Sequence, residues 1–277
     1  MKSNYRYIVK AFMAMAVIAG TTSCDDFLDR EPMSSISPET YYSTAAQLEA
    51  NLNDEYPNVL PSFGQWTYGI FGEDKGTDNQ IEVNANDRYT QDRWKVPHSE
   101  SDNWKFERIY RINFFLSEAL PKFGEDMSGS QNTISGSVAT IKHYIGEMYF
   151  LRAYEYFKKL QLFGDFPIIN QPLADEMEAL REASKRFPRN EVARFIISDL
   201  DKAYAYMSDV DMATTRINKD VAMLVKSRVA LFEATWLQNF KGTAFVPGGE
   251  GWPGASLHNN YQYCLLYTSP SPRDPKT

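Results

Sequence analysis

The sequence predicts an all-α protein, for the most part, built from tetratricopeptide-like helical pairs joined by long irregular loops. Three observations carry this prediction. Apolar residues recur at spacings of three and four along five segments, few segments alternate in the manner of strands, and one predicted helix is apolar on two faces. Small residues lie where neighbouring helices would approach closely, namely Ala153, Ala222 and Ala234. Because no 34-residue repeat is visible, the pattern leaves stacked antiparallel pairs and an irregular helical bundle open.

The first two predicted helices have recognisable ends. Thr44 and Gln47 fit a capping box, in which each residue caps the backbone of the other, and an apolar stripe follows up to Pro57. A second helix is expected from Ser101 to about Gly124. The stripes of the two helices are Leu48, Leu52 and Tyr56, and Trp104, Ile109, Ile112, Leu116 and Ala119.

Three further helices are expected in the second half of the chain. The first of them, residues 137–162, is the one with apolar stripes on two faces, so it must lie between neighbours, and Gly164 offers its C-cap. A charged connection, residues 175–186, precedes the next helix at about residues 190–207. Asn218 is the expected N-cap of the last helix. The stripe of that helix is Ala222, Val225, Val229, Phe232 and Trp236.

The amino terminus predicts export and lipidation. Three cations accompany an uncharged apolar run, residues 11–20, which is too short to span a bilayer and has the length of a signal-peptide core. Three small polar residues then precede Cys24 with a spacing that resembles the lipobox of bacterial lipoproteins. We therefore expect residues 1–23 to be a lipoprotein signal peptide and Cys24 to be the lipid-modified first residue. The alternative is an ordinary signal peptide before an incidental cysteine.

Composition narrows the function. A chain of 277 residues with 43% hydrophobic side chains can bury a sizeable core, and a mean hydropathy of -0.46 argues against a further membrane span. The net charge is -7, and removal of the predicted signal peptide with its cations makes it more negative. Such a balance argues against a nucleic-acid partner, which requires a clustered basic face. With Cys24 lipidated, Cys264 has no partner, so no disulfide framework is expected.

Four segments resemble the SusD/RagB family of outer-membrane nutrient-binding lipoproteins. They are residues 24–32 (CDDFLDREP), 37–48 (SPETYYSTAAQL), 146–157 (GEMYFLRAYEYF) and 162–169 (LFGDFPII). The resemblance implies a tetratricopeptide-type scaffold that sits as a lid on a TonB-dependent transporter barrel and captures oligosaccharides for import. It also implies a lipid anchor in the outer membrane and exposure at the cell surface, since Asp25 and Asp26 resemble the surface-export signal of such lipoproteins.

The mature chain is expected to have three parts. Residues 24–38 are acidic, Ser-rich and aperiodic, which favours a tether. Residues 39–263 resemble the N-terminal helical domain of the family, and we expect this domain to be incomplete because members are typically about twice as long. Residues 264–277 resemble translated sequencing-adapter read-through. This resemblance predicts a truncated gene model with a non-native tail, in which Cys264 is not a real site.

No catalytic or cofactor constellation is recognisable, which predicts a protein that is not an enzyme and holds neither a cofactor nor a metal. Residues 249–254 match the letters GxGxxG, but no predicted strand precedes them and Pro253 obstructs a phosphate-binding turn. The three histidines share no metal-ligand spacing, and His143 is expected to be packed or capping. Three acidic residues favour a solvated loop over a glycosidase carboxylate pair or a cation site. They are Glu73, Asp74 and Asp78.

The sugar-binding site is predicted within residues 61–99. This segment is rich in glycine and aromatic residues and has no clear periodicity, and long loops of this kind are usually functional or disordered. A pyranose offers an apolar face to an aromatic ring and hydroxyls to polar side chains, so the site requires a ring beside polar groups. The preferred cluster is Trp94, Arg93, Asp92 and Asn86, and the second is Trp66 and Gln65. The alternative is that Trp94 only packs the loop onto the scaffold.

Three classes of function remain open from the sequence. The leading prediction is a non-catalytic lipoprotein that binds oligosaccharides and passes them to the transporter. The runner-up is a secreted carbohydrate-active or other hydrolase with the same lipid anchor, and the third is an adhesion or scaffolding lipoprotein whose helical pairs hold another protein. The lack of a recognisable catalytic motif favours the first class over the second.

Overall fold

The computed structural model describes residues 41–61, 103–124, 126–207, 212–213 and 215–258, and the chain divides into two units after Tyr41. All described elements belong to the second unit. They are α4 (Ala45–Val59), α5 (Glu107–Phe123), α6 (Val138–Phe163), α7 (Met177–Ala183), α8 (Arg189–Tyr206), α9 (Lys219–Asn239) and the 3-10 helix η3 (Pro253–Ser256). Over these ranges the only β-type pairing is two isolated bridges. The all-α prediction is confirmed.

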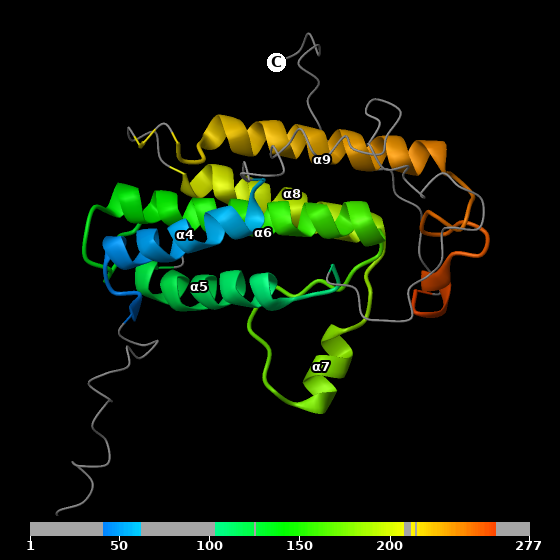
Figure 1. Cartoon of the computed structure of the whole chain (residues 1–277), viewed down its shortest axis with the longest axis horizontal. Coiled ribbons are helices and arrows are strands. Elements are labelled where there is room, and N and C mark those ends of the chain that lie inside the picture. The colour runs from blue at the N-terminus through cyan, green and yellow to red at the C-terminus, as the bar shows by residue number, and fades with distance from the viewer. Residues whose placement is uncertain (1–40, 62–102, 125, 208–211, 214, 259–277) are drawn as a thin grey trace, which may run out of the picture. The chain divides into compact units, whose positions relative to one another are not determined.

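Helix α6 is the centre of the described fold. It packs against α4 and α5 and, with another face, against α8, which in turn packs against α9 (Figure 1). The long helices α5, α6, α8 and α9 run in alternating directions, so consecutive long helices form antiparallel pairs (Figure 1). Most residues of α6 are buried, including residues on all of its sides. The two apolar stripes predicted for this segment therefore mark a helix that is covered from several directions.

The predicted capping box of α4, the predicted C-cap of α6 and the predicted N-cap of α9 are present, and α6 has a side-chain N-cap as well. Gln47 N donates to Thr44 Oγ1 at 3.3 Å, and Thr44 N donates to Gln47 Oε1 at 3.0 Å, which completes the capping box of α4. The side chain of Ser137 caps α6, and that of Asn218 caps α9 by accepting from Val221 N at 3.0 Å. The C-cap of α6 is Gly164, whose φ of 68° favours glycine. These ends are local in origin, which explains why the sequence predicts them.

The end of α4 and the charged connection differ from the prediction. α4 continues past Pro57 to Val59, because a proline in the last turn removes a single backbone hydrogen bond there. The charged connection, residues 175–186, contains the short helix α7, all of whose residues are exposed or half-buried. A helix of this length is marginal in water without external contacts, so its formation depends on the segments around it.

Helix α5 begins at Glu107 and not at residue 101, and Trp104 lies before it. The Trp104 ring packs edge-on against Phe163 at 4.8 Å and Phe166 at 4.9 Å between ring centroids. The guanidinium of Arg186 covers the same ring at 4.6 Å. These partners come from the end of α6 and from the segments before and after α7, so the start of α5 is set by long-range packing.

The buried face of α9 differs in part from its predicted stripe. Ala222 and Val229 are buried as expected, whereas Val225, Phe232 and Trp236 are only half-buried. Glu233 occupies a central buried position, where it pairs with an arginine of α8. The predicted stripe was identified from apolar residues alone, so it did not include the buried Glu233, which explains the difference.

Gly146 lets α6 and α8 approach closely. A Cβ atom at this position would lie 2.8 Å from Met207 N and 2.9 Å from Ala203 O, which are backbone atoms at the end of α8. Backbone atoms cannot move aside in the way that the tip of a flexible side chain can. The close crossing of the central pair therefore requires glycine here, although glycine weakens a helix interior by roughly 1 kcal/mol relative to alanine.

Three arginine–carboxylate pairs connect the helices, and two of them are buried on both sides. Arg152 of α6 makes a bidentate pair with Asp199 of α8, at 2.6 and 2.8 Å. Arg189, at the start of α8, makes a bidentate pair with Glu233 of α9. The third arginine, Arg216, lies before α9 and binds a carboxylate of α6. Bidentate pairing fixes the geometry of both partners, so each pair defines the relative position of the two segments that it joins.

The Arg152–Asp199 pair can be tested against a surface pair on the same helix. Asp199→Ala leaves a buried guanidinium without its counter-charge and is expected to lower the free energy of unfolding by about 3–5 kcal/mol. Asp201→Ala removes a carboxylate that is 55% exposed and pairs with Lys226, so a change below about 1 kcal/mol is expected. Urea denaturation followed by circular dichroism measures both. Equal losses in the two variants would contradict the assignment.

Candidate ligand-binding pocket

The residues proposed from sequence for lipidation and sugar binding lie outside the described part of the chain. They are Cys24, Gln65, Trp66, Asn86, Asp92, Arg93 and Trp94. The same holds for the acidic loop residues Glu73, Asp74 and Asp78. Their positions therefore remain predictions.

His143 and the glycine-rich segment can be located. His143 is buried in α6, with Nε2 3.0 Å from Ile217 O and 3.0 Å from Glu147 Oε1, so it is packed into the scaffold as expected. Residues 249–254 form turns that run into η3, and the described residues before them form turns as well. Such a segment lacks the strand that precedes a dinucleotide-binding loop.

The described ranges hold no grouping of three or more His, Cys, Asp or Glu residues that could bind a metal ion. Within the same ranges, no helix has both the length and the apolar character needed to cross a bilayer. A candidate binding site in the described part of the chain is therefore a cavity with suitable lining residues.

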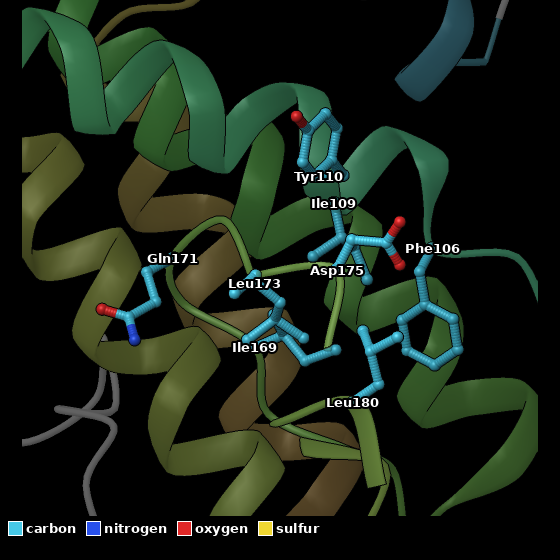
Figure 2. A pocket seen from close by; sticks show the side chains of 9 residues that line it. Phe106, Ile109, Tyr110, Ile169, Gln171, Leu173, Asp175 and Leu180 are labelled. Carbon is cyan, nitrogen blue, oxygen red and sulfur yellow. The ribbon is translucent and has the colours of Figure 1, made fainter. Parts of the chain in front are cut away.

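A pocket of about 230 Å³ lies between the start of α5, the segment 169–175 and α7. Figure 2 shows the lining side chains, which come from these three elements. The lining is mainly apolar, with Asp175 as its one charged member. The lining residues are Phe106, Ile109, Tyr110, Ile169, Gln171, Leu173, Ala174, Asp175 and Leu180.

One wall of the pocket is aromatic. Phe106 directly precedes α5 and stacks on Phe166, with ring centroids 5.2 Å apart and planes 16° apart. Tyr110 lies one turn later, stacks on Phe114 and remains 51% exposed. Each ring is thus held by an aromatic neighbour, so the wall is positioned by packing before any ligand arrives.

The opposite wall is a loop fixed by the buried network of α5 and α6. Asn113 Nδ2 donates to Ile169 O at 2.9 Å, and Arg152 Nη1 donates to Asn170 O at 3.1 Å. The Tyr156 hydroxyl donates to Ile169 O at 3.0 Å and accepts from Ile169 N at 2.8 Å. Arg152 also donates to Asn113 Oδ1 at 2.9 Å, which connects these anchors into one network. The loop backbone is therefore held from inside the bundle.

The protonation states of this network follow from burial and charge. Burial lowers the pKa of Arg152, but the hydrogen bonds and the charge of Asp199 outweigh burial and leave that pKa above its ordinary value. Burial raises the pKa of Tyr156 far above the neutral range, against the opposing effect of its hydrogen bond with Ile169. Arg152 is therefore charged and Tyr156 keeps its proton at physiological pH, as the hydrogen bonds to the loop carbonyls require.

The one charged group that lines the pocket is the carboxylate of Asp175. The Asp175 carboxylate points toward the side where Tyr110 and Phe106 lie, whereas Gln171 lies at the opposite end (Figure 2). Asp175 is exposed and makes no ion pair or hydrogen bond with the described residues. The pocket thus combines an apolar interior with a carboxylate whose acceptor sites are available to a ligand.

Comparison with known proteins decides the family. A model of a SusD-like family, described as "Starch-binding associating with outer membrane", matches residues 26–231. The chain belongs to this SusD-like family. The resemblance noted in the sequence is thereby confirmed.

Relatives of this SusD-like chain include proteins of Formosa agariphila and Bacteroides fragilis. SusD-like protein P2 of Formosa agariphila is 24% identical over 269 residues, which cover 93% of this chain and 49% of the relative. SusD-like protein P25 of the same organism is 25% identical over 233 residues, which cover 77% and 41%. A crystal structure of a SusD-like protein from Bacteroides fragilis is similar with a TM-score of 0.52 and 21% identity, covering 76% of this chain and 39% of that one. The chain spans about half the length or less of these relatives.

Sequence reasoning missed the pocket of this SusD-like chain. Residues 175–186 are expected to be a charged connection, and the segment 169–175 has no periodic pattern. One local signal existed, because Tyr110 lies beside the apolar stripe of Ile109 and Ile112 and not on it. A large ring on the outer side of an amphipathic helix is a candidate contact residue, although the pattern does not show what it would contact.

The anchoring of the pocket wall can be tested by removing one hydroxyl. Tyr156→Phe deletes both hydrogen bonds to Ile169, so faster hydrogen exchange at the Ile169 amide and a loss of about 1–3 kcal/mol in unfolding free energy are expected. Tyr149→Phe is the matched control, since Tyr149 is also buried in α6 but its hydroxyl bonds to no described residue. Unchanged exchange at Ile169 in Tyr156→Phe would show that the hydroxyl does not fix the loop.

Proposed function

We propose that the mature protein captures oligosaccharides at the cell surface without cleaving them and passes them to a TonB-dependent transporter barrel in the outer membrane. A lipid on Cys24 anchors the protein after removal of residues 1–23, and residues 24–38 form the tether. The observation that carries this proposal is the family match over residues 26–231, because the family description joins starch binding to association with the outer membrane.

The described scaffold favours binding over catalysis. Glu147, Asp199 and Glu233 are its most deeply buried carboxylates, and each forms a bidentate pair with an arginine. Glu147 also accepts from the Tyr56 hydroxyl at 2.7 Å. Carboxylates held in such pairs connect helices and are not available to transfer protons to a glycosidic bond. This supports a binding protein over the alternative of an anchored hydrolase.

The primary sugar contacts are proposed to come from the loop cluster of Trp94, Arg93, Asp92 and Asn86, with Trp66 and Gln65 as the second cluster. An aromatic ring can stack on the apolar face of a pyranose, while Arg, Asp and Asn side chains bind its hydroxyls. In the sequence, the cluster lies before the segment that forms the aromatic wall of the pocket.

Affinity gel electrophoresis against a panel of soluble polysaccharides tests the proposal. For a polysaccharide that retards the wild type, Trp94→Ala is expected to weaken binding about tenfold through loss of the stacking ring. Trp94→Phe retains a ring and is expected to bind almost as well as the wild type. Thermal melting curves check that both variants are folded. Equal retardation of wild type and Trp94→Ala would remove Trp94 from the site.

The same protein preparation separates binding from hydrolysis. Reducing ends are measured after long incubation with each polysaccharide that binds. The proposal expects none above background, because capture without cleavage is what delivery to a transporter requires. Release of reducing ends by the pure wild type would overturn the non-catalytic assignment in favour of a hydrolase.

Substitution of Cys24 tests the anchor. Cys24→Ser is expected to abolish incorporation of labelled palmitate and to move the protein from the membrane fraction to the soluble fraction, since two or three acyl chains on one residue give effectively permanent attachment. Cys264→Ser is the matched control and is expected to change neither property. Palmitate labelling that persists in Cys24→Ser would contradict the assignment of the lipid to this residue.

A further inference from the structure

The pocket of Figure 2 has the size of one sugar ring, an almost wholly apolar surface with aromatic rings in its lining, and one carboxylate among its lining residues. We propose that it is a glycan subsite that takes a single pyranose, in addition to the loop cluster around Trp94. The subsite deepens the proposed function and rests on it. Tyr110 and Phe106 would face the apolar side of the sugar, and Asp175 would accept hydrogen bonds from its hydroxyls.

The volume of the pocket limits its occupant. Sites for drug-sized ligands enclose roughly 300–1,000 Å³. The pocket encloses about 230 Å³, so it accommodates one ring-sized group and not a chain of several units. The remainder of an oligosaccharide would have to extend out of the pocket over the exposed side chain of Tyr110.

The lining matches an amphipathic ring. A pyranose has apolar C–H faces and a polar edge, so it needs apolar walls and a few directed acceptors or donors. The walls are supplied by the two aromatic rings and by the aliphatic residues of the loop and α7, while the rim carries the Asp175 carboxylate. A charged acceptor binds hydroxyl groups more strongly than a neutral one. The Tyr110 hydroxyl bonds to no described residue, and the Tyr110 side chain is 51% exposed.

The walls are positioned before binding. Three consecutive loop carbonyls accept hydrogen bonds from the scaffold: those of Ile169 and Gln171 from Asn113 Nδ2, at 2.9 and 3.5 Å, and that of Asn170 from Arg152 Nη1. A wall that is already fixed loses little conformational freedom when a ligand binds, which strengthens weak sugar contacts. The buried charge of Arg152 thus supports the pocket without touching its occupant.

A second cavity of about 330 Å³ beside α6 does not offer the same chemistry. Its lining is dominated by charged side chains, and Glu155 lies 2.6 Å from Lys158 and 3.4 Å from Lys159. Lys159 also donates to Asn103 O. Glu155 and the two lysines of this cavity are therefore paired with one another, whereas the Asp175 carboxylate pairs with no described residue.

Methyl-resolved NMR on the whole chain tests the subsite independently of any polysaccharide. The probes are methyl β-D-glucopyranoside, methyl β-D-galactopyranoside and methyl β-D-xylopyranoside, at tens of millimolar. Shifts are expected for the pocket methyl groups of Ile109, Ile169, Leu173 and Leu180, and not for those of the core residue Leu48. Cyclohexanol serves as a ring with a single hydroxyl in place of the several hydroxyls of a pyranoside, and butylguanidinium as a cation that Asp175 would attract.

Two pocket variants have matched controls elsewhere on the surface. Tyr110→Ala removes a platform ring, and Tyr204→Ala removes a similarly exposed tyrosine of α8. Asp175→Asn removes the charged acceptor, and Asp220→Asn alters an exposed carboxylate of α9. Each pocket variant is expected to weaken pyranoside binding about three- to tenfold, and each control to leave it unchanged. A third variant, Ala174→Phe, would fill the pocket and abolish the shifts while keeping both binding groups.

The outcomes separate this subsite from the proposed function. Pyranoside shifts that are lost in Tyr110→Ala and Ala174→Phe support the subsite, even if no polysaccharide of the panel binds. Polysaccharide binding by the wild type without pyranoside shifts overturns the subsite and leaves the proposed function standing. Stronger shifts with butylguanidinium than with any pyranoside also overturn it, and would assign the pocket to a basic side chain of a protein. Equal shifts with cyclohexanol and pyranosides would reject a role for Asp175 and with it the sugar assignment.

Discussion

The described structure depends on the burial of one charged residue in its central helix. The guanidinium of Arg152 has five N–H donors, and a donor buried without an acceptor costs several kcal/mol. Asp199 of α8 and Asn113 of α5 accept from it, and Asn170 of the following loop accepts as well. Satisfying this one group therefore joins three elements to α6. The same requirement brings the loop back over the bundle, where its side chains form a wall of the pocket.

Similar pairs recur at the other helix contacts. Arg189 and Glu233 connect the start of α8 to α9, and Arg216 and Glu147 connect the segment before α9 to α6. Replacing a buried ion pair by apolar residues is often neutral or stabilising, so such pairs contribute less to stability than to a defined arrangement. Antiparallel helices with apolar faces can slide along one another at small cost. A bidentate pair favours one position of two neighbouring segments along each other. The three pairs together therefore define the relative positions of α6, α8, α9 and the segment before α9.

Whether a feature of this structure can be predicted from the sequence depends on how far apart in the chain its interacting residues lie. The ends of α4, α6 and α9 depend on residues within one turn, namely Thr44, Ser137 and Asn218, and were predictable for that reason. The start of α5 depends on Trp104 meeting Phe166, which is distant in the chain, and no local pattern contains that contact. The pocket is less predictable still, because its walls come from three separate segments. The family was recognisable because short sequence segments carry it, whereas the loop residues around Trp94 lie outside the described ranges and stay a prediction.

The anchoring of the pocket wall has a consequence for how ligand preference can vary. The network holds the loop through backbone atoms, namely the N–H of Ile169 and the carbonyls of residues 169–171. The side chains of Ile169 and Gln171 line the pocket and take no part in that anchoring. A substitution at either position changes the surface offered to a ligand while every hydrogen bond to α5 and α6 is retained. Because the buried network contacts only the backbone of these residues, the side chains that line the proposed subsite can change while the scaffold keeps its register.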